Sequence, residues 1–215
     1  MSLTRRRLAL ALALTPLAGA LGGTPALGLG LPPADQALVD RAVVYLEGLD
    51  EARARFVQTD ARGHSVAGQV SLKRPGKARF AYDPPSGLTV VSDGHFVSVQ
   101  DTRLKSFDRY PLVATPLSLF LAKTIRLDKG VAVTGVSRMA DGFTITARDG
   151  RKQTAGQITL AFTDNPLSLA GWTVVDPQGR ATRVRLQNLQ PAPGLSNDLF
   201  ELADPRPKNP GRGKL

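Results

Sequence analysis

The fold is decided by the stretch at residues 66–82, which reads VAGQVSLKRPGKARFAY. Apolar residues or glycine stand at every second position from Val66 to Leu72, and a period of two is typical of a strand with one buried face. Arg74-Pro75-Gly76 then supplies turn residues, and a second strand-like run begins at Lys77. Two strands joined by so short a turn pair antiparallel, so the stretch predicts a β-hairpin.

The same rhythm extends over most of the chain. Strand-like runs are separated by turn residues, above all by the Asp-Gly pairs at 93–94, 141–142 and 149–150, which favour tight hairpin turns. Hairpins in series predict an antiparallel meander rather than an alternation of strands and helices. About eleven strands are expected, at residues 53–60, 66–74, 77–83, 87–92, 95–100, 103–109, 131–139, 142–148, 156–163, 167–175 and 180–189.

Two segments have a helical rather than a strand-like pattern. Residues 34–49 carry leucine, valine and alanine at helical spacing, with Asp35 placed to cap the helix. Thr115-Pro116 is expected to open a second helix, because a hydroxyl cap followed by proline favours helix initiation. The body of that helix, residues 117–122, is apolar nearly all round. It therefore either plugs one end of the sheet or closes an apolar cavity.

The N-terminus predicts a signal peptide over residues 1–28. Arg5-Arg6-Arg7 precedes a run of leucine and alanine at 8–14, and small residues follow. The general secretory route is favoured, although Thr4-Arg5-Arg6-Arg7-Leu8 also resembles a twin-arginine motif. A single domain is expected at 29–202. Residues 203–215, rich in Pro, Lys, Arg and Gly, are expected to form a flexible basic tail.

Composition narrows the function classes. The 215-residue chain has a net charge of +10, and without the three arginines of the leader 25 basic residues face 18 acidic ones, a balance near +7. Cysteine is absent, which excludes disulfides, thiolate metal sites and thiol nucleophiles. The basic residues are scattered, so a plain solvated surface and a membrane-facing surface both remain open, while export argues against nucleic acid as a partner.

Catalytic motifs are not apparent in the sequence. The two histidines, His64 and His95, both follow glycine in expected turns. Ser92-Asp93-Gly94-His95 contains the ingredients of a hydrolytic triad, but adjacent residues on a hairpin point in divergent directions. The sequence holds no phosphate-binding glycine loop, dinucleotide fingerprint or known metal-ligand spacing. We therefore predict a binding protein without catalytic residues, metal or cofactor, and keep an unrecognised hydrolase as a remoter alternative.

A family resemblance appears around the opening hairpin. The segment LKRPGKARFAYDPP at 72–85, followed by Val90-Val91-Ser92-Asp93-Gly94, resembles the LolA-type periplasmic carriers of outer-membrane lipoproteins. Arg55-Phe56-Val57-Gln58, Thr115-Pro116-Leu117 and residues 197–202 are similar to further family segments, in the same order. The resemblance covers most of residues 34–202.

The resemblance implies a mainly β fold with a few helices: an incomplete (half) antiparallel β-barrel of about eleven strands with a helical lid. It also implies a periplasmic carrier that takes acylated lipoproteins from an inner-membrane ABC release complex to an acceptor lipoprotein at the outer membrane. Such a carrier needs no cofactor, and we expect a monomer. A lipid-binding or regulatory protein on the same half-barrel is the alternative.

The resemblance also assigns roles to particular residues. Arg74 matches the family arginine that tethers the lid in the closed, empty state, with an ordinary solvated arginine beside a turn as the alternative. Ala78 is small where relatives often carry a bulky aromatic residue, which would suit a differently shaped lipid. The candidates for the acyl-chain cavity and lid, for which a plain core is the alternative, are Phe80, Tyr82, Val90, Leu117, Phe120 and Leu121.

Overall fold

The structure is a computed structural model that describes residues 30–115, 117–124, 131–149 and 156–206; the side chains of Leu119, Phe120, Val131 and Asp149 fall outside this description. The chain divides into two compact units, Met1–Pro32 and Pro33–Leu215, and all the described helices and strands belong to the second. The predicted signal peptide, residues 1–28, lies outside the described residues.

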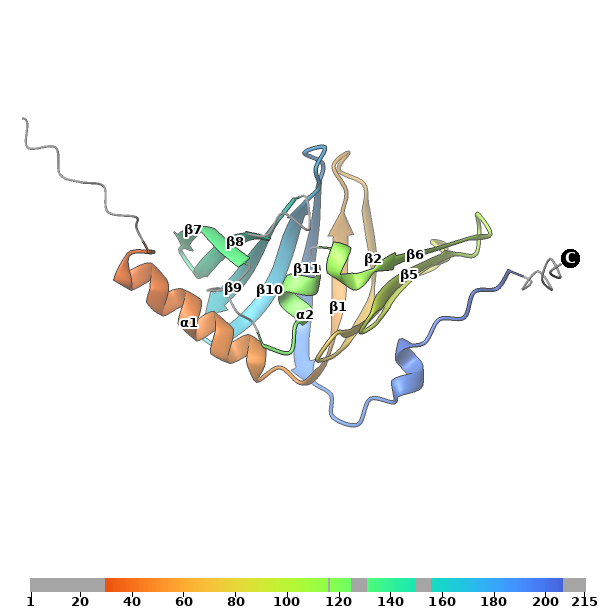
Figure 1. The fold of residues 1–215 in the computed structure, drawn as a ribbon, viewed down its shortest axis with the longest axis horizontal. Helices are drawn as coiled ribbons and strands as arrows, with labels where there is room; N and C mark the ends of the chain where they lie inside the picture. Colours follow the sequence, from red (N-terminus) through yellow and green to blue (C-terminus); the bar gives the residue numbers. More distant parts are fainter. Residues whose placement is uncertain (1–29, 116, 125–130, 150–155, 207–215) are drawn as a thin grey trace, which may run out of the picture. The chain divides into compact units, whose positions relative to one another are not determined.

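The second unit is built on one antiparallel sheet (Figure 1). Its 11 strands lie in the order β6-β5-β4-β3-β2-β1-β11-β10-β9-β8-β7, so β6 and β7 form the two edges and the sheet does not close. This confirms the expected mainly β fold, an incomplete antiparallel barrel of eleven strands. The strands are β1 (Glu51–Thr59), β2 (Ser65–Lys73), β3 (Lys77–Tyr82), β4 (Leu88–Asp93), β5 (Phe96–Asp101), β6 (Ser106–Pro111), β7 (Val131–Met139), β8 (Gly142–Asp149), β9 (Gln157–Asp164), β10 (Leu167–Val175) and β11 (Ala181–Pro191).

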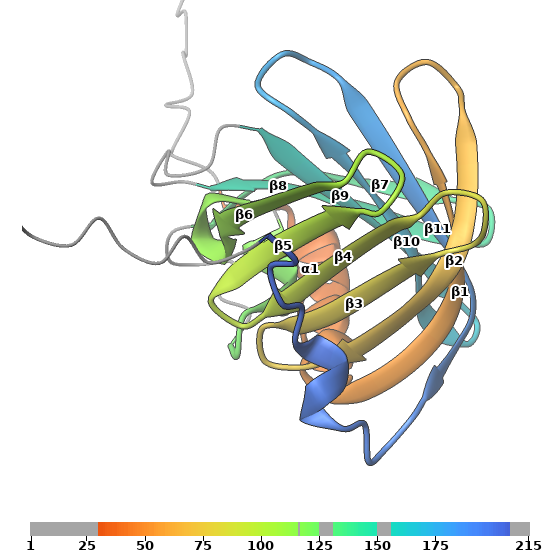
Figure 2. The same ribbon diagram turned by 90° about the vertical axis from the view of Figure 1, so that its right-hand side faces the viewer.

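The sheet is strongly curved (Figure 2). The ring centroids of Phe80 on β3 and Trp172 on β10 are 6.0 Å apart, although three strands lie between β3 and β10. In a flat sheet, the backbones of those two strands would be about 19 Å apart at a spacing of about 4.8 Å per strand. Side chains from the two halves of the sheet therefore meet over a concave inner face.

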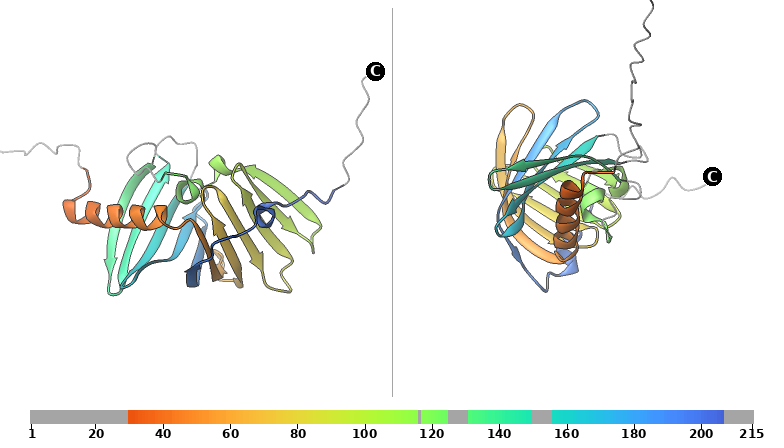
Figure 3. Two further views of the ribbon diagram at one scale, coloured as in Figure 1. Left: turned by 90° about the horizontal axis from the view of Figure 1, so that it is seen from below. Right: turned by 90° about the vertical axis from the view of Figure 1, so that its left-hand side faces the viewer.

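Two α-helices lie on the concave side: α1 (Pro33–Glu47) and α2 (Leu117–Leu121), the latter preceded by the 3-10 helix η1 (Leu112–Ala114) (Figure 3). A second 3-10 helix, η2 (Asn197–Phe200), packs on the outer face, where Phe200 and Leu195 contact Val91 of β4. α1 confirms the helix expected at 34–49, and it buries the apolar residues that face the sheet: Leu38, Val39, Ala42 and Leu46. None of the described helices is long and apolar enough to cross a membrane.

Two local expectations are wrong. The strand expected at 103–109 begins only at Ser106, because the Asp101 carboxylate accepts hydrogen bonds from the amides of Arg103 and Leu104, at 2.8 and 3.0 Å, and holds a turn there. The Thr115 hydroxyl was expected to cap the second helix. It instead donates a hydrogen bond of 2.8 Å to the carbonyl oxygen of Leu112, and so closes η1 rather than opening α2.

Candidate functional site

The first half of the concave face is lined by apolar side chains. Register places Val70 of β2 opposite Phe80 of β3, and Phe80 opposite Val90 of β4. Directly paired residues share one face of a sheet, so these side chains form a row across three strands. Phe80 is 6% exposed and Val90 is partly buried. The structure thus brings together two of the wall residues predicted from sequence.

Phe56 of β1 lies at the centre of this wall. Its ring contacts the ring of Phe80 at a centroid distance of 5.5 Å and the ring of Tyr82 at 5.0 Å, both edge to face. Gly68 makes the room, because a Cβ at this position would come within 2.7 Å of the Phe56 ring. The Tyr82 hydroxyl donates a 2.7 Å hydrogen bond to Gln58, and burial raises the pKa of Tyr82 to about 12. This part of the wall is therefore uncharged at neutral pH.

The second half of the sheet completes the apolar face and is covered by α1. The rings of Phe143 and Phe162 stack at 5.2 Å, and Tyr45 of α1 meets the Phe162 ring edge to face at 6.1 Å. Arg41 of α1 forms a 2.7 Å ion pair with Asp164, which lies at the end of β9. Further buried side chains of these strands are Ile145, Ala147, Ile158, Leu169 and Trp172.

Helix α2 lies against the turn between β2 and β3. Leu121 is fully buried, Leu117 is partly buried, and the side chain of Phe120 lies outside the described part of the structure. The amide of Gly76 donates a 2.8 Å hydrogen bond to the carbonyl oxygen of Leu121. The end of α2 is thus fixed to the hairpin that carries the predicted arginine.

Arg74 contacts the segment directly after α2. Its Nη2 donates a 2.5 Å hydrogen bond to the carbonyl oxygen of Ala122, while Nε and Nη1 are buried without a hydrogen-bond partner among the described residues. Burial lowers the pKa of the Arg74 guanidinium, and the nearby carboxylates of Glu47 and Asp50 oppose that shift. The guanidinium therefore stays charged at neutral pH, with donors left over in the closed arrangement.

The residues of the possible hydrolytic triad do not converge. Ser92 Oγ donates a 2.6 Å hydrogen bond to the carbonyl oxygen of Gly76, on the concave side. One oxygen of Asp93 accepts from the amides of His95 and Phe96, and the other forms a 2.9 Å ion pair with Arg109. Asp93 thus organises the β4–β5 turn, whereas Ser92 bonds to the β2–β3 turn, as the divergent directions of neighbouring residues predict. The described residues also contain no group of three His, Asp or Glu side chains able to hold a metal ion.

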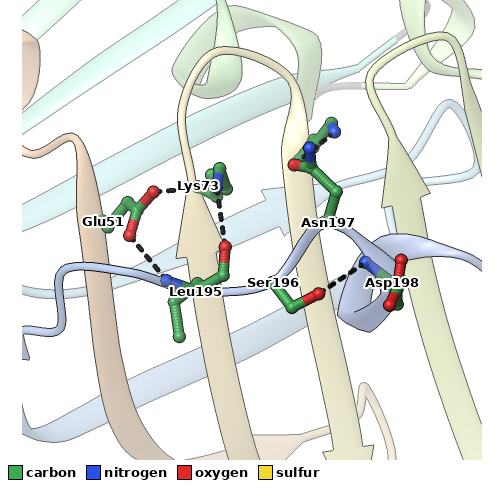
Figure 4. Close-up of polar contacts among 7 residues, drawn as sticks. Glu51, Lys73, Leu195, Ser196, Asn197 and Asp198 are labelled. Carbon is green, nitrogen blue, oxygen red and sulfur yellow. Dashed lines mark hydrogen bonds and ion pairs between the residues drawn. The ribbon is translucent and has the colours of Figure 1, made fainter.

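A second feature is the segment from Ala192 to Arg206, which we call the C-terminal strap. It leaves β11 and runs along the outer face (Figures 2 and 4). The Glu51 carboxylate accepts the Leu195 amide at 2.8 Å and pairs with Lys73 at 2.9 Å, while Lys73 Nζ donates to the Leu195 carbonyl oxygen at 2.7 Å. Arg79 donates to the carbonyl oxygen of Leu199 at 3.2 Å.

Sequence reasoning did not predict where the strap lies. Residues 197–202 were singled out only as a family segment, and 203–215 were expected to be a flexible tail. Of that tail, residues 203–206 are described, and the Arg206 guanidinium lies 5.6 Å from the centre of the Phe107 ring. A usable sequence signal was that Val91 and Phe107 are apolar at strand positions that alternation puts on the outer face, where such residues need a cover. In the structure both are nearly fully buried.

Acid is expected to loosen the strap. The amide of Leu195 and the charge of Lys73 lower the pKa of Glu51 below its ordinary value of 4.5. A carboxylate with a depressed pKa stabilises the fold above its unfolded pKa, and this contribution is lost as the pH falls through the folded value. Hydrogen exchange should therefore show the Leu195 amide well protected at about pH 6 and much less protected at about pH 3. A Glu51→Gln control should remove that pH dependence, and equal protection of the wild type at both pH values would contradict the assignment.

Known proteins similar to this chain include outer-membrane lipoprotein carriers. Residues 47–203 match the family described as outer membrane lipoprotein carrier protein LolA. An outer-membrane lipoprotein carrier protein of Methylobacillus flagellatus is 28% identical over 178 residues, covering 78% of this chain and 85% of that protein. The corresponding protein of Methylibium petroleiphilum is 26% identical over 179 residues, with the same shares covered.

Among solved structures, a LolA superfamily protein from Nitrosomonas europaea aligns with a TM-score of 0.46 at 11% identity, covering 78% of this chain and 97% of that one. The family match alone spans well over half of the chain, from the end of α1 through most of the strap. On this match, the chain belongs to the LolA family of outer membrane lipoprotein carrier proteins.

Proposed function

We propose that this protein is a periplasmic carrier that shields the acyl chains of lipoproteins on its concave face and ferries them from the inner to the outer membrane. One observation carries the proposal. An apolar, curved face lies beside a short helix, and Arg74 holds the segment after that helix by a hydrogen bond to Ala122. The relatives are named as lipoprotein carriers, which suggests that the cargo is a lipoprotein and that the protein binds rather than catalyses.

The energetics of an acyl chain in water explain why such a carrier is needed. Burying one methylene is worth about 0.8 kcal/mol, so a chain of about 16 carbons would cost on the order of 10 kcal/mol to expose. Diffusion of a bare lipoprotein across an aqueous compartment is then negligible. A curved sheet presents alternate side chains inward, which supplies a continuous apolar wall.

Loading must compete with contacts that already exist. In the structure the Phe80 and Trp172 rings meet, and Leu121 is fully buried, so acyl chains enter only when these groups move apart. We propose that α2 is the lid and that the Arg74–Ala122 hydrogen bond is its latch.

Export and delivery complete the proposal. Residues 1–28 act as the signal peptide, by the general secretory route, and residues 29–202 form the carrier domain. An inner-membrane ABC complex releases the lipoprotein to the carrier, and an acceptor lipoprotein at the outer membrane receives it. The carrier needs no cofactor, because the ABC complex supplies the energy.

Native mass spectrometry of the exported protein, purified without detergent, tests the proposal. We expect a fraction of the molecules to retain an acylated protein in one-to-one stoichiometry. Vesicles that contain the ABC complex and a lipoprotein should likewise release the lipoprotein only when the carrier is added. Recovery of free phospholipid alone would favour a lipid-binding or regulatory protein on the same fold, and the absence of any bound acyl chain would overturn both readings.

A charge on the inner side of α2 should weaken loading. Leu117 is partly buried in the proposed lid, and an aspartate there would place a carboxylate beside bound acyl chains. We expect Leu117→Asp to lower the yield of carrier–lipoprotein complex by about tenfold or more. Leu104→Asp is the matched control, because Leu104 is 76% exposed in the β5–β6 turn. Equal yields from both variants would mean that α2 only packs against the sheet.

A further inference from the structure

Four arginines gather on the outer face of the two central strands. Arg53 and Arg55 lie on β1, and Arg183 and Arg185 lie on β11. Side chains alternate between the two faces of a strand, so all four arginines lie on the face opposite Phe56. In the β1–β11 pairing, Arg185 stands opposite Val57 and Arg183 opposite Thr59. We call this set the outer-face arginines. Arg55, Arg185 and Arg183 stand at neighbouring positions across the β1–β11 pairing, and Arg53 lies two residues further along β1.

Three of these four cations have no acidic partner among the described residues. Arg55 forms a bidentate pair with Asp83, at 2.9 and 2.5 Å. Arg53, Arg183 and Arg185 make no ion pair or side-chain hydrogen bond within the described part of the chain, and all three are exposed. Like charges this close repel one another, so an anionic partner would stabilise the arrangement.

The surface beside the arginines is hollowed. One hollow of about 430 Å³ lies between β11, β1 and β2 and is bordered by Arg53, Arg55 and Gln69. A second, of about 530 Å³, reaches from β11 across β10 and β9 to β8 and β7 and is bordered by Arg183, Arg185 and Thr159. Small residues such as Ala161 and Gly171 line the second hollow, so an extended chain can approach the sheet closely there.

The strap shows how this protein holds an extended segment on the neighbouring part of the same face. Lys73 donates to the Leu195 carbonyl oxygen at 2.7 Å (Figure 4), and Lys77 and Arg79 donate to further strap oxygen atoms at 2.9 and 3.2 Å. The strap carries a net negative charge, because it contains Asp198, Glu201 and Asp204 against a single basic residue, Arg206. A cationic stretch of the outer face is thus covered by an acidic segment, whereas the outer-face arginines have no such cover among the described residues.

The ends of this chain do not have the composition to provide that cover. Residues 1–29 and 207–215 contain no aspartate or glutamate, and both stretches are basic. We therefore propose that the outer-face arginines bind an extended acidic segment of a partner protein. Guanidinium groups favour carboxylates because their paired N–H donors match both oxygen atoms. This interaction surface is separate from the concave face and does not depend on the proposed cargo.

Fluorescence anisotropy with a synthetic probe tests the inference. The probe is a labelled peptide of about ten residues, long enough to span the block of arginines, in which glutamate alternates with threonine. A second peptide replaces each glutamate with glutamine. We expect the exported full chain to bind the acidic peptide at physiological salt and to bind the glutamine peptide far more weakly. The double variant Arg183→Gln/Arg185→Gln should bind the acidic peptide about tenfold more weakly or worse.

A matched variant separates recognition from overall charge. Arg103→Gln/Lys105→Gln removes the same charge from the β5–β6 turn and should bind the acidic peptide nearly as well as the wild type. Equal weakening in both double variants would overturn the proposal, because only net charge would then matter. Binding to vesicles of phosphatidylglycerol and phosphatidylcholine that depends on Arg183 and Arg185, without peptide binding, would overturn it in favour of a membrane. Lipoprotein uptake by Arg183→Gln/Arg185→Gln should be unchanged, so this proposal and the carrier function can fail separately.

Discussion

The Arg74→Leu variant is expected to fold normally and yet to deliver lipoprotein to an acceptor roughly ten- to hundredfold more slowly than the wild type. The fold should survive because leucine removes two buried nitrogen atoms that lack hydrogen-bond partners in the described structure. Replacing a poorly satisfied buried charge by an apolar side chain is often neutral or stabilising. The melting temperature should therefore change little, because the lost hydrogen bond to Ala122 and the removal of the two buried nitrogen atoms have opposite effects.

Delivery should fail because the latch favours the empty, closed state. The hydrogen bond from Arg74 to the Ala122 carbonyl oxygen carries a charge, and such bonds are worth about 1.5–3 kcal/mol. Without it the closed state competes less well with bound acyl chains, so the loaded state is favoured by the same amount. Loading should be normal or improved, and the defect should appear only in transfer to the acceptor, measured with purified loaded carrier.

Arg79→Leu is the matched control for this experiment. Arg79 also donates to a backbone carbonyl oxygen, that of Leu199, but it lies on the outer face under the strap. It should transfer lipoprotein at the wild-type rate. Normal transfer by Arg74→Leu, or an equal defect in both variants, would remove Arg74 from the release step.

Phe80→Ala is expected to lower the free energy of unfolding by about 3–5 kcal/mol and to change acyl-chain binding as well. Phe80 is 6% exposed and touches rings on both halves of the sheet, Phe56 at 5.5 Å and Trp172 at 6.0 Å. Truncation leaves a cavity at this junction. Because the cavity opens on the proposed cargo surface, the affinity for a fluorescent fatty acid should shift severalfold while denaturation by urea reports the loss of stability.

Phe107→Ala separates the two effects. Phe107 is equally buried, at 6% exposure, but it lies on the outer face near Arg206. Phe107→Ala should lower the free energy of unfolding by about as much as Phe80→Ala does, and it should leave the affinity for acyl chains unchanged. If both variants changed affinity alike, the aromatic cluster around Phe80 would be an ordinary core rather than a cavity wall.

Much of the fold could be predicted because local signals agree along the chain. Period-two alternation and Asp-Gly turns located eleven strands, and no strand boundary shifted by more than two residues except at the start of β6. There the exposed turn at 102–105 contains Leu104, which resembles a strand residue in sequence. The position of this turn is decided by the Asp101 carboxylate and by Lys105, whose backbone is left-handed with φ of 54°. A hydrophobic pattern reveals neither of these features.

The site was harder to predict because it depends on contacts between distant segments. The alternation of side chains separates the two faces of a strand but does not say which of them is the concave face. In this sheet apolar residues are buried on both faces, as Phe80 and Val91 show. The sequence likewise placed Arg74 beside a turn, while its reach to Ala122 depends on where α2 packs. The Glu51–Leu195 contact joins residues 144 positions apart, and no local pattern signals it.

The strand order also implies a sequence of folding events. Every pairing in the sheet joins strands that are consecutive in the chain except one, β1 with β11, so the sheet consists of two successive meanders joined along a single seam. Local pairings form quickly, whereas closing a loop of more than a hundred residues is slow, so the seam should form last. Arg53 and Arg55 lie on one side of that seam and Arg183 and Arg185 on the other. A partner that needs all four guanidinium groups would therefore recognise only molecules whose folding is complete.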